Sequence, residues 1–166
     1  MALPSSGRGI VVDGAADPEH ITNPLTFTDS NWIWTGGAAP DGPRPLRKTN
    51  SHTNTKCPVD NRYTLYANGT EIGSAIVYEG SGSASQVYTV GLSPEIDNVI
   101  AIDATNTGGP TGLIATIHVD YLDGTSETFV TDVSWKTLKT ATASGFETPS
   151  LDDSSCIAAN VEGRRG

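Results

Sequence analysis

Asp60 and Asn61 stand next to each other directly before the strand-like run Tyr63–Ala67. A carboxylate beside a carboxamide at the entrance of a strand supplies two oxygen ligands of the kind that Ca²⁺ takes. The same pair is typical of an Asx turn, in which the side chain bonds the local backbone and starts the strand. From the residues alone both interpretations stay open, and composition favours the turn.

Signatures of catalysis are sparse in the rest of the chain. There is no nucleophile elbow, no HExxH zinc motif, no phosphate-binding loop and no GxGxxG sequence. The three histidines, His20, His52 and His118, are far apart, and the pattern around His118 indicates an outward-facing strand residue. The run Asp152–Ser155 is typical of a turn or cap. We therefore predict that the protein is not an enzyme.

Three tryptophans, Trp32, Trp34 and Trp135, are the other residues with binding chemistry. Trp32 and Trp34 stand at i and i+2, which places them on one face of a strand. A tryptophan that stacks on a sugar must expose its ring face. Core positions in a sandwich are the interpretation that the sequence favours for all three.

Short strands are the elements that must position these residues. The run 114–121 alternates apolar and polar side chains, which is typical of a half-buried strand. Asp123-Gly124 and Asn68-Gly69 each separate two strand-like runs, and such pairs predict tight hairpins because glycine tolerates a positive φ. About eight short strands and no long helix predict an all-β fold, an antiparallel β-sandwich of jelly-roll type.

The composition agrees with such a fold and excludes some partners. With 166 residues, we expect a single domain that spans residues 1–166, with its core at about 10–163. Glycine and proline are frequent, at 18 and 10 residues, which indicates many turns. The net charge of −9 argues against nucleic acid and anionic membranes as partners, because both are bound by positive charge. Nothing resembles a membrane span.

The cysteines and the start of the chain bear on the compartment. Cys57 and Cys156 fit neither a zinc site nor a disulfide-rich scaffold, and two separate thiols are favoured over a disulfide. The first residues, MALPSSGRGIVV, contain no apolar run long enough for the core of a signal peptide.

Several segments taken together resemble one family. They are FTDSNWIWTG, PLRKT, DNRYTLYANGTEIGSA, NVIAIDATN, GGPTGLIATIHVDYLDGTSETFVTDVSWK and LDDSSCIAAN. Their order and spacing, over most of residues 25–163, are similar to the galactose-binding-like jelly roll. This fold occurs in the carbohydrate-binding modules of α-L-rhamnosidases and in calcium-dependent fungal lectins.

The resemblance implies a lectin that binds galactose, N-acetylgalactosamine or rhamnose-type sugars with the help of Ca²⁺. Asp60 and Asn61 match the pair that holds the calcium, whose open positions two vicinal sugar hydroxyls fill. Asn106 and Pro110 match the loop beside the ligand, Asn106–Gly112. Glycans are then the expected partners, and homo-oligomerisation would raise a modest affinity. Such proteins are often secreted, so the compartment stays open.

Two departures from the family keep an alternative open. Relatives carry a tryptophan shortly after the NG hairpin, whereas this chain has Tyr78, which we expect to take its place. Relatives also carry an apolar strand where residues 50–59 are polar and contain a proline, a run with almost no strand propensity. Either the sheet is rebuilt, or residues are missing from the sequence here, or the chain is an interrupted paralogue. The alternatives in function are a structural or self-assembling sandwich that has lost its sugar site, and a small jelly-roll glycosidase.

Overall fold

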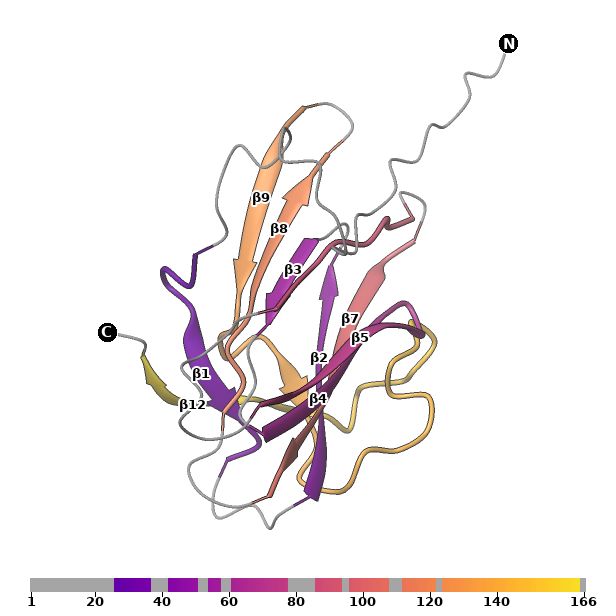
Figure 1. The fold of residues 1–166 in the computed structure, drawn as a ribbon. Coiled ribbons are helices and arrows are strands. Elements are labelled where there is room, and N and C mark those ends of the chain that lie inside the picture. The colour runs from indigo at the N-terminus through magenta and orange to yellow at the C-terminus, as the bar shows by residue number, and fades with distance from the viewer. Residues whose placement is uncertain are drawn as a thin grey trace.

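The fold is a β-sandwich with loops at both ends, drawn as a computed structural model in Figure 1. The structure describes residues 26–36, 42–50, 54–57, 61–77, 86–93, 96–107, 112–121 and 124–164. For Asn50, Asn54–Cys57, Asn61, Val77 and Arg164 it describes the backbone alone. Over these residues every element is a strand and no helix occurs, which confirms the all-β prediction.

The described residues form twelve strands, more than the eight or so expected. Their bounds are β1 (Asn31–Trp34), β2 (Gly42–Asn50), β3 (Asn54–Cys57), β4 (Asn61–Ala67), β5 (Thr70–Val77), β6 (Gln86–Tyr88), β7 (Asn98–Asn106), β8 (Thr116–Asp120), β9 (Ser126–Val130), β10 (Lys136–Thr137), β11 (Ile157–Ala158) and β12 (Asn160–Arg164). Two of the additional strands, β10 and β11, have two residues each and carry no periodicity. The longer β2 and β3 contain prolines or polar residues, which hide the strand pattern.

Two larger sheets face each other, and every pairing in them is antiparallel. One has six strands in the order β11-β10-β2-β7-β4-β5, and the other has four in the order β6-β3-β8-β9. A two-stranded ribbon of β1 and β12 lies at one side. No described helix is long and apolar enough to cross a membrane.

Both predicted hairpins are present. Asn68 and Gly69 have φ of 50° and 85° between β4 and β5, so both turn residues adopt the left-handed conformation that a type I′ hairpin needs. Gly124 has φ of 86° between β8 and β9. Asn68 also ties its turn to the start of β7, because its Oδ1 accepts a hydrogen bond from the Val99 amide at 2.8 Å.

The polar run 50–59 contains a strand, which corrects the expectation of almost no strand propensity. Asn54–Cys57 forms β3, which pairs with β6 on one side and with β8 on the other. A strand between two others satisfies its amide and carbonyl groups through its neighbours, so backbone pairing outweighs weak side-chain propensity here. The sheet is rebuilt with polar residues, and no strand is lost at this position.

Strand β2 contains Pro43 and Pro45 although it lies inside the six-stranded sheet. It pairs with β7 along its whole length, but β10 pairs with it only at Leu46 and Arg47. Proline has no amide hydrogen to donate and is therefore tolerated where one side of a strand is unpaired. The first half of β2 is in effect an edge strand, which explains both prolines.

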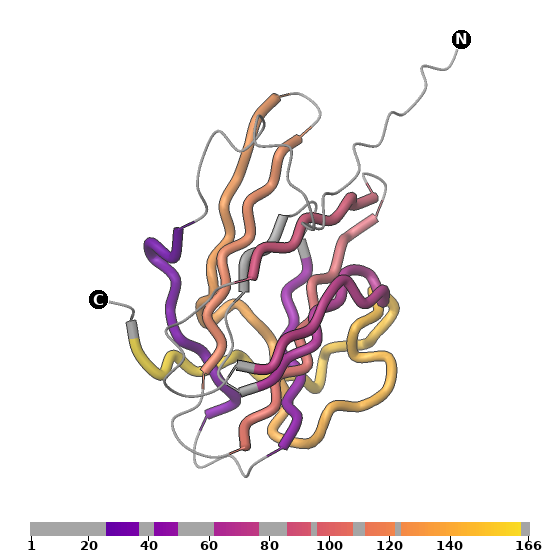
Figure 2. Tube along the Cα trace, viewed as in Figure 1, coloured from indigo at the N-terminus to yellow at the C-terminus, as the bar shows by residue number. Residues whose placement is uncertain are grey.

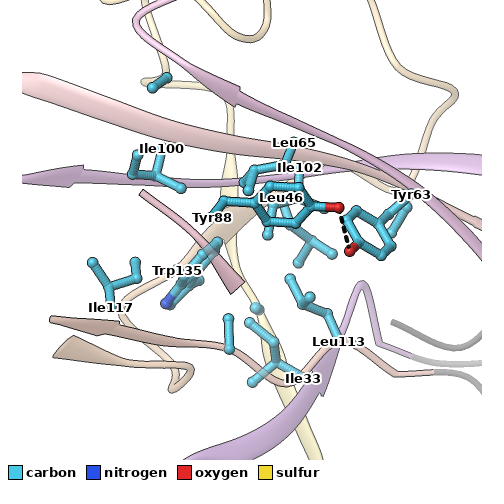
Figure 3. Packing of buried hydrophobic residues seen from close by; sticks show 14 of the residues in the cluster. Ile33, Leu46, Tyr63, Leu65, Tyr88, Ile100, Ile102, Leu113, Ile117 and Trp135 are labelled. Carbon is cyan, nitrogen blue, oxygen red and sulfur yellow. Dashed lines mark hydrogen bonds between the residues drawn. The ribbon is translucent and has the colours of Figure 1, made fainter. Parts of the chain in front are cut away.

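The main core lies between the two sheets. Its largest fully buried side chain is that of Trp135, and Figure 3 shows it among aliphatic and tyrosine side chains from both layers. Its indole Nε1 donates to the Val130 carbonyl at 3.1 Å, so the buried polar atom is satisfied. The other labelled members are Ile33, Leu46, Tyr63, Leu65, Tyr88, Ile100, Ile102, Leu113 and Ile117.

A long segment without strands, residues 138–156, covers the outer face of the six-stranded sheet (Figure 2). Phe146 in this segment is buried against Val99 and Ala101 of β7. Its ring meets that of Tyr66 edge to face, with centroids 5.7 Å apart. The segment therefore buries a second, smaller apolar cluster and keeps β7 covered on both faces.

Candidate functional site

One end of the six-stranded sheet brings together two of the predicted site residues. Asn61 is the first residue of β4 and Asn106 is the last residue of β7. The two strands are antiparallel, and Arg62 is the register partner of Thr105. One further step along both strands leads to Asn61 and Asn106, so their backbones lie opposite each other.

The other predicted site residues fall outside the described ranges. These are Asp60, Tyr78 and Pro110. Asn61 pairs with Val77 on β5, so the chain leaves β5 toward residue 78 at the same end of the sheet. The roles assigned to all five residues stay predictions, and the strand register places only Asn61 and Asn106 at this sheet end.

Asn106 is the predicted ligand residue whose side chain the structure describes. It is 6% exposed and pairs with Gly42 at the start of β2. Alternate residues of a strand point to the same face, so Asn106 shares the inner face with Ala104 and Ile102 of the core. A buried carboxamide at the rim of an apolar core is a polar group of the kind found in binding sites.

Arg44 is a residue of this end that sequence reasoning missed. Its side chain is 4% exposed, and its Nη1 donates to the Pro43 carbonyl at 2.7 Å. A Cβ added to Gly42 would lie 3.7 Å from the same Nη1 atom. The guanidinium therefore adds hydrogen-bond donors and a positive charge beside Asn106. The signal was the alternation of Arg44 with buried Leu46, which predicts an inward-facing arginine.

Trp32 does not occupy the core position that the sequence favoured. Trp34 and Trp135 are core residues, as expected, but Trp32 is only half-buried. It packs on Gly112, where an added Cβ would lie 2.7 Å from its Cε3 atom. Gly112 is the last residue of the Asn106–Gly112 loop. An aromatic ring therefore stands where this loop ends, on β1 rather than after the NG hairpin.

The two tryptophans lie on opposite sides of a register shift between β1 and β12. Trp32 pairs with Gly163 and Ile33 with Val161, so β12 carries an extra residue, Glu162, at this point. A bulge twists and bends the ribbon locally, so residues at i and i+2 need not share an environment. Strict alternation from sequence consequently placed both rings in the core.

His118 and Asp152, two titratable residues outside this sheet end, have structural partners. His118 Nδ1 lies 3.0 Å from Thr128 Oγ1, and its Nε2 lies 3.3 Å from Asp120 Oδ1, on the β8–β9 ladder. Asp152 accepts the Ser154 amide at 3.0 Å, as expected of a turn, and this bond lowers the pKa of its carboxyl. Among the described residues no three His, Cys, Asp or Glu side chains are grouped to hold a metal ion.

Cys156 carries a free, half-buried thiol at the start of β11. Burial raises the pKa of this thiol, and the nearby Asp153 carboxylate raises it further. A raised pKa keeps the group as a thiol, which is the unreactive form.

Comparison with known proteins gives matches among solved structures. The chain matches no protein-family model and no curated protein. The apo lectin of Pleurotus ostreatus is 40% identical to it, with a TM-score of 0.74 over 86% of this chain and 44% of that one. The same lectin in complex with GalNAc matches with a TM-score of 0.73, 40% identity and the same coverage of 86% and 44%.

The chain resembles a fungal lectin. This confirms the resemblance drawn from the ordered motifs. The α-L-rhamnosidase of Streptomyces avermitilis, complexed with L-rhamnose, matches at 23% identity and a TM-score of 0.68, over 96% of this chain and 16% of that chain. At that identity the rhamnosidase match supports the β-sandwich fold alone. The chain spans less than half the length of the lectin that it matches.

Proposed function

We propose that this chain is a carbohydrate-binding protein of the lectin type, which binds galactose, N-acetylgalactosamine or rhamnose-type sugars with the help of Ca²⁺. The observation that carries the proposal is its 40% identity, over 86% of its length, to a lectin solved in complex with GalNAc. The site we assign is the sheet end formed by Asn61 and Asn106 with the residues that adjoin them.

The donor set at this end fits a calcium ion. Asp60 and Asn61 supply a carboxylate and a carboxamide oxygen, and Ca²⁺ takes six to eight oxygen ligands of these kinds. Asn106, at the end of the neighbouring strand β7, adds a second, buried carboxamide. Bound calcium would supply open coordination positions for two neighbouring sugar hydroxyls. The protein residues would set which hydroxyl pair can reach the ion.

The remaining residues of the site would bind the sugar itself. The Arg44 guanidinium brings donors to the same end, and Arg44 is nearly inaccessible to water, so its hydrogen bonds would be little screened. The half-buried ring of Trp32 can pack on the apolar face of a sugar ring at the far end of the loop. Together they account for recognition without a tryptophan after the NG hairpin.

The structural or self-assembling alternative loses part of its support. It drew on an absent strand and an absent tryptophan. Strand β3 occupies the chain position of that strand, and Trp32 provides a partly exposed ring near the loop. The glycosidase alternative has less support than the lectin, because the matched structures of 40% identity are lectins.

Isothermal titration calorimetry tests the proposal. GalNAc, galactose and L-rhamnose are titrated into the chain in excess Ca²⁺ and again after treatment with EDTA. We expect saturable heat for at least one sugar and its loss with EDTA. The absence of heat for all three sugars in excess Ca²⁺ would overturn the lectin assignment, and binding that persists in EDTA would overturn the calcium role.

A pair of matched variants locates the site. Asp60→Asn removes the proposed carboxylate ligand, and Asp97→Asn makes the same change at an exposed residue beside the opposite end of β7. We expect the first variant to lose calcium-dependent binding and the second to bind like the wild type. Equal binding by both variants would move the site elsewhere on the sandwich.

A further inference from the structure

An open pocket of about 170 Å³ lies beside the second half of β2, away from the Asn106 end of that strand. It opens where β10 begins, because β10 pairs with β2 only as far as Arg47 and the last residues of β2 continue beyond it. The residues that line it are Arg47, Lys48, Thr49, Ser134, Lys136 and Asp153.

Positive charge gathers in this pocket of an acidic protein. Arg47, Lys48 and Lys136 are three of the ten lysines and arginines of a chain whose net charge is −9. One carboxylate, that of Asp153, lines the pocket with them. Its Oδ1 lies 2.7 Å from Lys136 Nζ, and its Oδ2 lies 3.8 Å from Arg47 Nε.

Arg47 presents a buried donor that this ion pair does not satisfy. Its side chain is 4% exposed, and its Nη1 donates to the Phe146 carbonyl at 3.2 Å. Its Nε atom is buried and has no hydrogen-bond partner among the described residues. The 3.8 Å contact with Asp153 is longer than a hydrogen bond. A buried charged donor without an acceptor is costly, so an acceptor oxygen at this place would be favourable.

Lys48, the third cation of the pocket, contacts a hydroxyl rather than a carboxylate. Lys48 Nζ donates to Ser134 Oγ, and the Ser134 amide donates to Asp132 Oδ1 at 2.8 Å. The lining itself holds three cations and one carboxylate. Asp132 and Asp152 lie outside the lining, where Asp132 accepts from Ser134 and Lys136 helps to lower the pKa of the Asp152 carboxyl.

We propose that this pocket binds a tetrahedral oxyanion, sulfate or phosphate. The anion would accept from the ammonium groups of Lys48 and Lys136 in charge-assisted bonds of the strong kind, and the guanidinium charge of Arg47 beside them would stabilise it further. Its four oxygens can serve several donors at once, which the two oxygens of Asp153 do not. The same chemistry fits a free ion or an acidic substituent on a glycan.

Calorimetry with inorganic anions tests the pocket without any sugar. Sodium sulfate and sodium phosphate are titrated into the full chain against sodium chloride of matched ionic strength. We expect saturable binding of sulfate or phosphate, weakened about tenfold in Lys48→Gln and in Lys136→Gln. The matched control is Lys139→Gln, an exposed lysine that does not line the pocket, and its binding should be unchanged.

Two results would overturn the proposal. One is the absence of saturable binding to the folded wild type. The other is equal binding by the two pocket variants and the Lys139→Gln control. Asp153→Asn should change the affinity in the opposite direction to the lysine variants, because removal of the carboxylate should strengthen sulfate binding. Circular dichroism identifies a variant that fails to fold. In that case the titration of the wild type still shows whether the protein binds sulfate or phosphate.

The source of the anion is decided in a second series. GalNAc bearing a 6-sulfate is compared with GalNAc and with inorganic sulfate. A sulfated sugar that binds more tightly than both, and loses its advantage in Lys48→Gln, assigns the pocket to a sulfated glycan. Equal binding of free and sugar-borne sulfate assigns it to a free ion. Because the first series needs no sugar, its failure is distinct from failure of the lectin proposal.

Discussion

Tyr63 and Tyr88 join the two sheets hydroxyl to hydroxyl. Their oxygen atoms lie 3.0 Å apart, and their rings meet edge to face at 84° with centroids 6.3 Å apart (Figure 3). Tyr63 comes from β4 of the six-stranded sheet and Tyr88 from β6 of the four-stranded sheet. The pair is therefore a polar contact inside an otherwise apolar core.

Removing one hydroxyl of this pair should cost more than removing both. Tyr63→Phe leaves the Tyr88 hydroxyl buried without its partner, and we expect a loss of about 1–2 kcal/mol in the free energy of unfolding. Tyr63→Phe combined with Tyr88→Phe leaves no orphan, so its loss should not exceed that of the single variant. Urea denaturation measures the wild type, Tyr63→Phe, Tyr88→Phe and the double variant. Additive losses would contradict the coupling.

Gly73 is required by the same tyrosine. A Cβ added there would lie 2.1 Å from Tyr88 Cε1, so Gly73→Ala must displace the ring. Overpacking of this kind costs about 1–3 kcal/mol. Gly163→Ala is the matched control, because nothing lies within 4 Å of a Cβ added in β12. Thermal and urea unfolding should separate the two variants, and similar losses in both would refute the steric explanation.

Asp103 should make stability depend on pH. Burial raises the pKa of its carboxyl, and the hydrogen bond from Thr142 Oγ1 at 2.6 Å only partly opposes this. A carboxyl whose pKa is higher in the folded state stabilises the fold below the unfolded pKa of about 3.9, and this contribution is lost as the pH rises through the folded value.

Asp103→Asn should therefore be more stable than the wild type at pH 7. Its advantage should shrink on acidification and vanish near pH 3, where the wild-type carboxyl is protonated in both states. Urea titrations from pH 3 to pH 8 measure this difference. A wild type that is the more stable protein at pH 7 would show that the Thr142 bond outweighs burial.

Trp32 should contribute to sugar affinity if the proposed site is right. Trp32→Ala removes the half-buried ring beside Gly112, and we expect GalNAc to bind about tenfold more weakly, an effect of about 1.4 kcal/mol. Trp32→Phe keeps an aromatic face and should retain most of the affinity. Calorimetry measures binding, and the thermal midpoint checks the fold. Unchanged affinity in Trp32→Ala would show that this ring is not part of the sugar site.

The hairpins were predictable because their signals are local. Asn68-Gly69 and Asp123-Gly124 predict tight turns, since few residues adopt a positive φ without an energetic cost. The alternation of 114–121 likewise places Ile117 and Val119 in the core, where the structure has them. These patterns depend on residues that are neighbours along the chain.

Other elements could not be read from local signals. Strand β3 is polar and forms because β6 and β8 pair with it on both sides. The prolines of β2 argue against an inner strand, and only the structure shows that β10 pairs with β2 at just Leu46 and Arg47. Trp32 is only half-buried, and it lies where the pairing of β1 with β12 changes register. Each depends on a partner that is remote in sequence.

By itself, the sequence determined the fold class, the two hairpins and the Asp60–Asn61 pair as a candidate for calcium. Tertiary structure decided which distant residues meet. The antiparallel pairing of β4 with β7 brings Asn61 and Asn106 to one sheet end, and the covering segment 138–156 brings Asp153 to Arg47. Periodicity reports the face of a strand, whereas strand order and loop path depend on packing energies summed over the whole core.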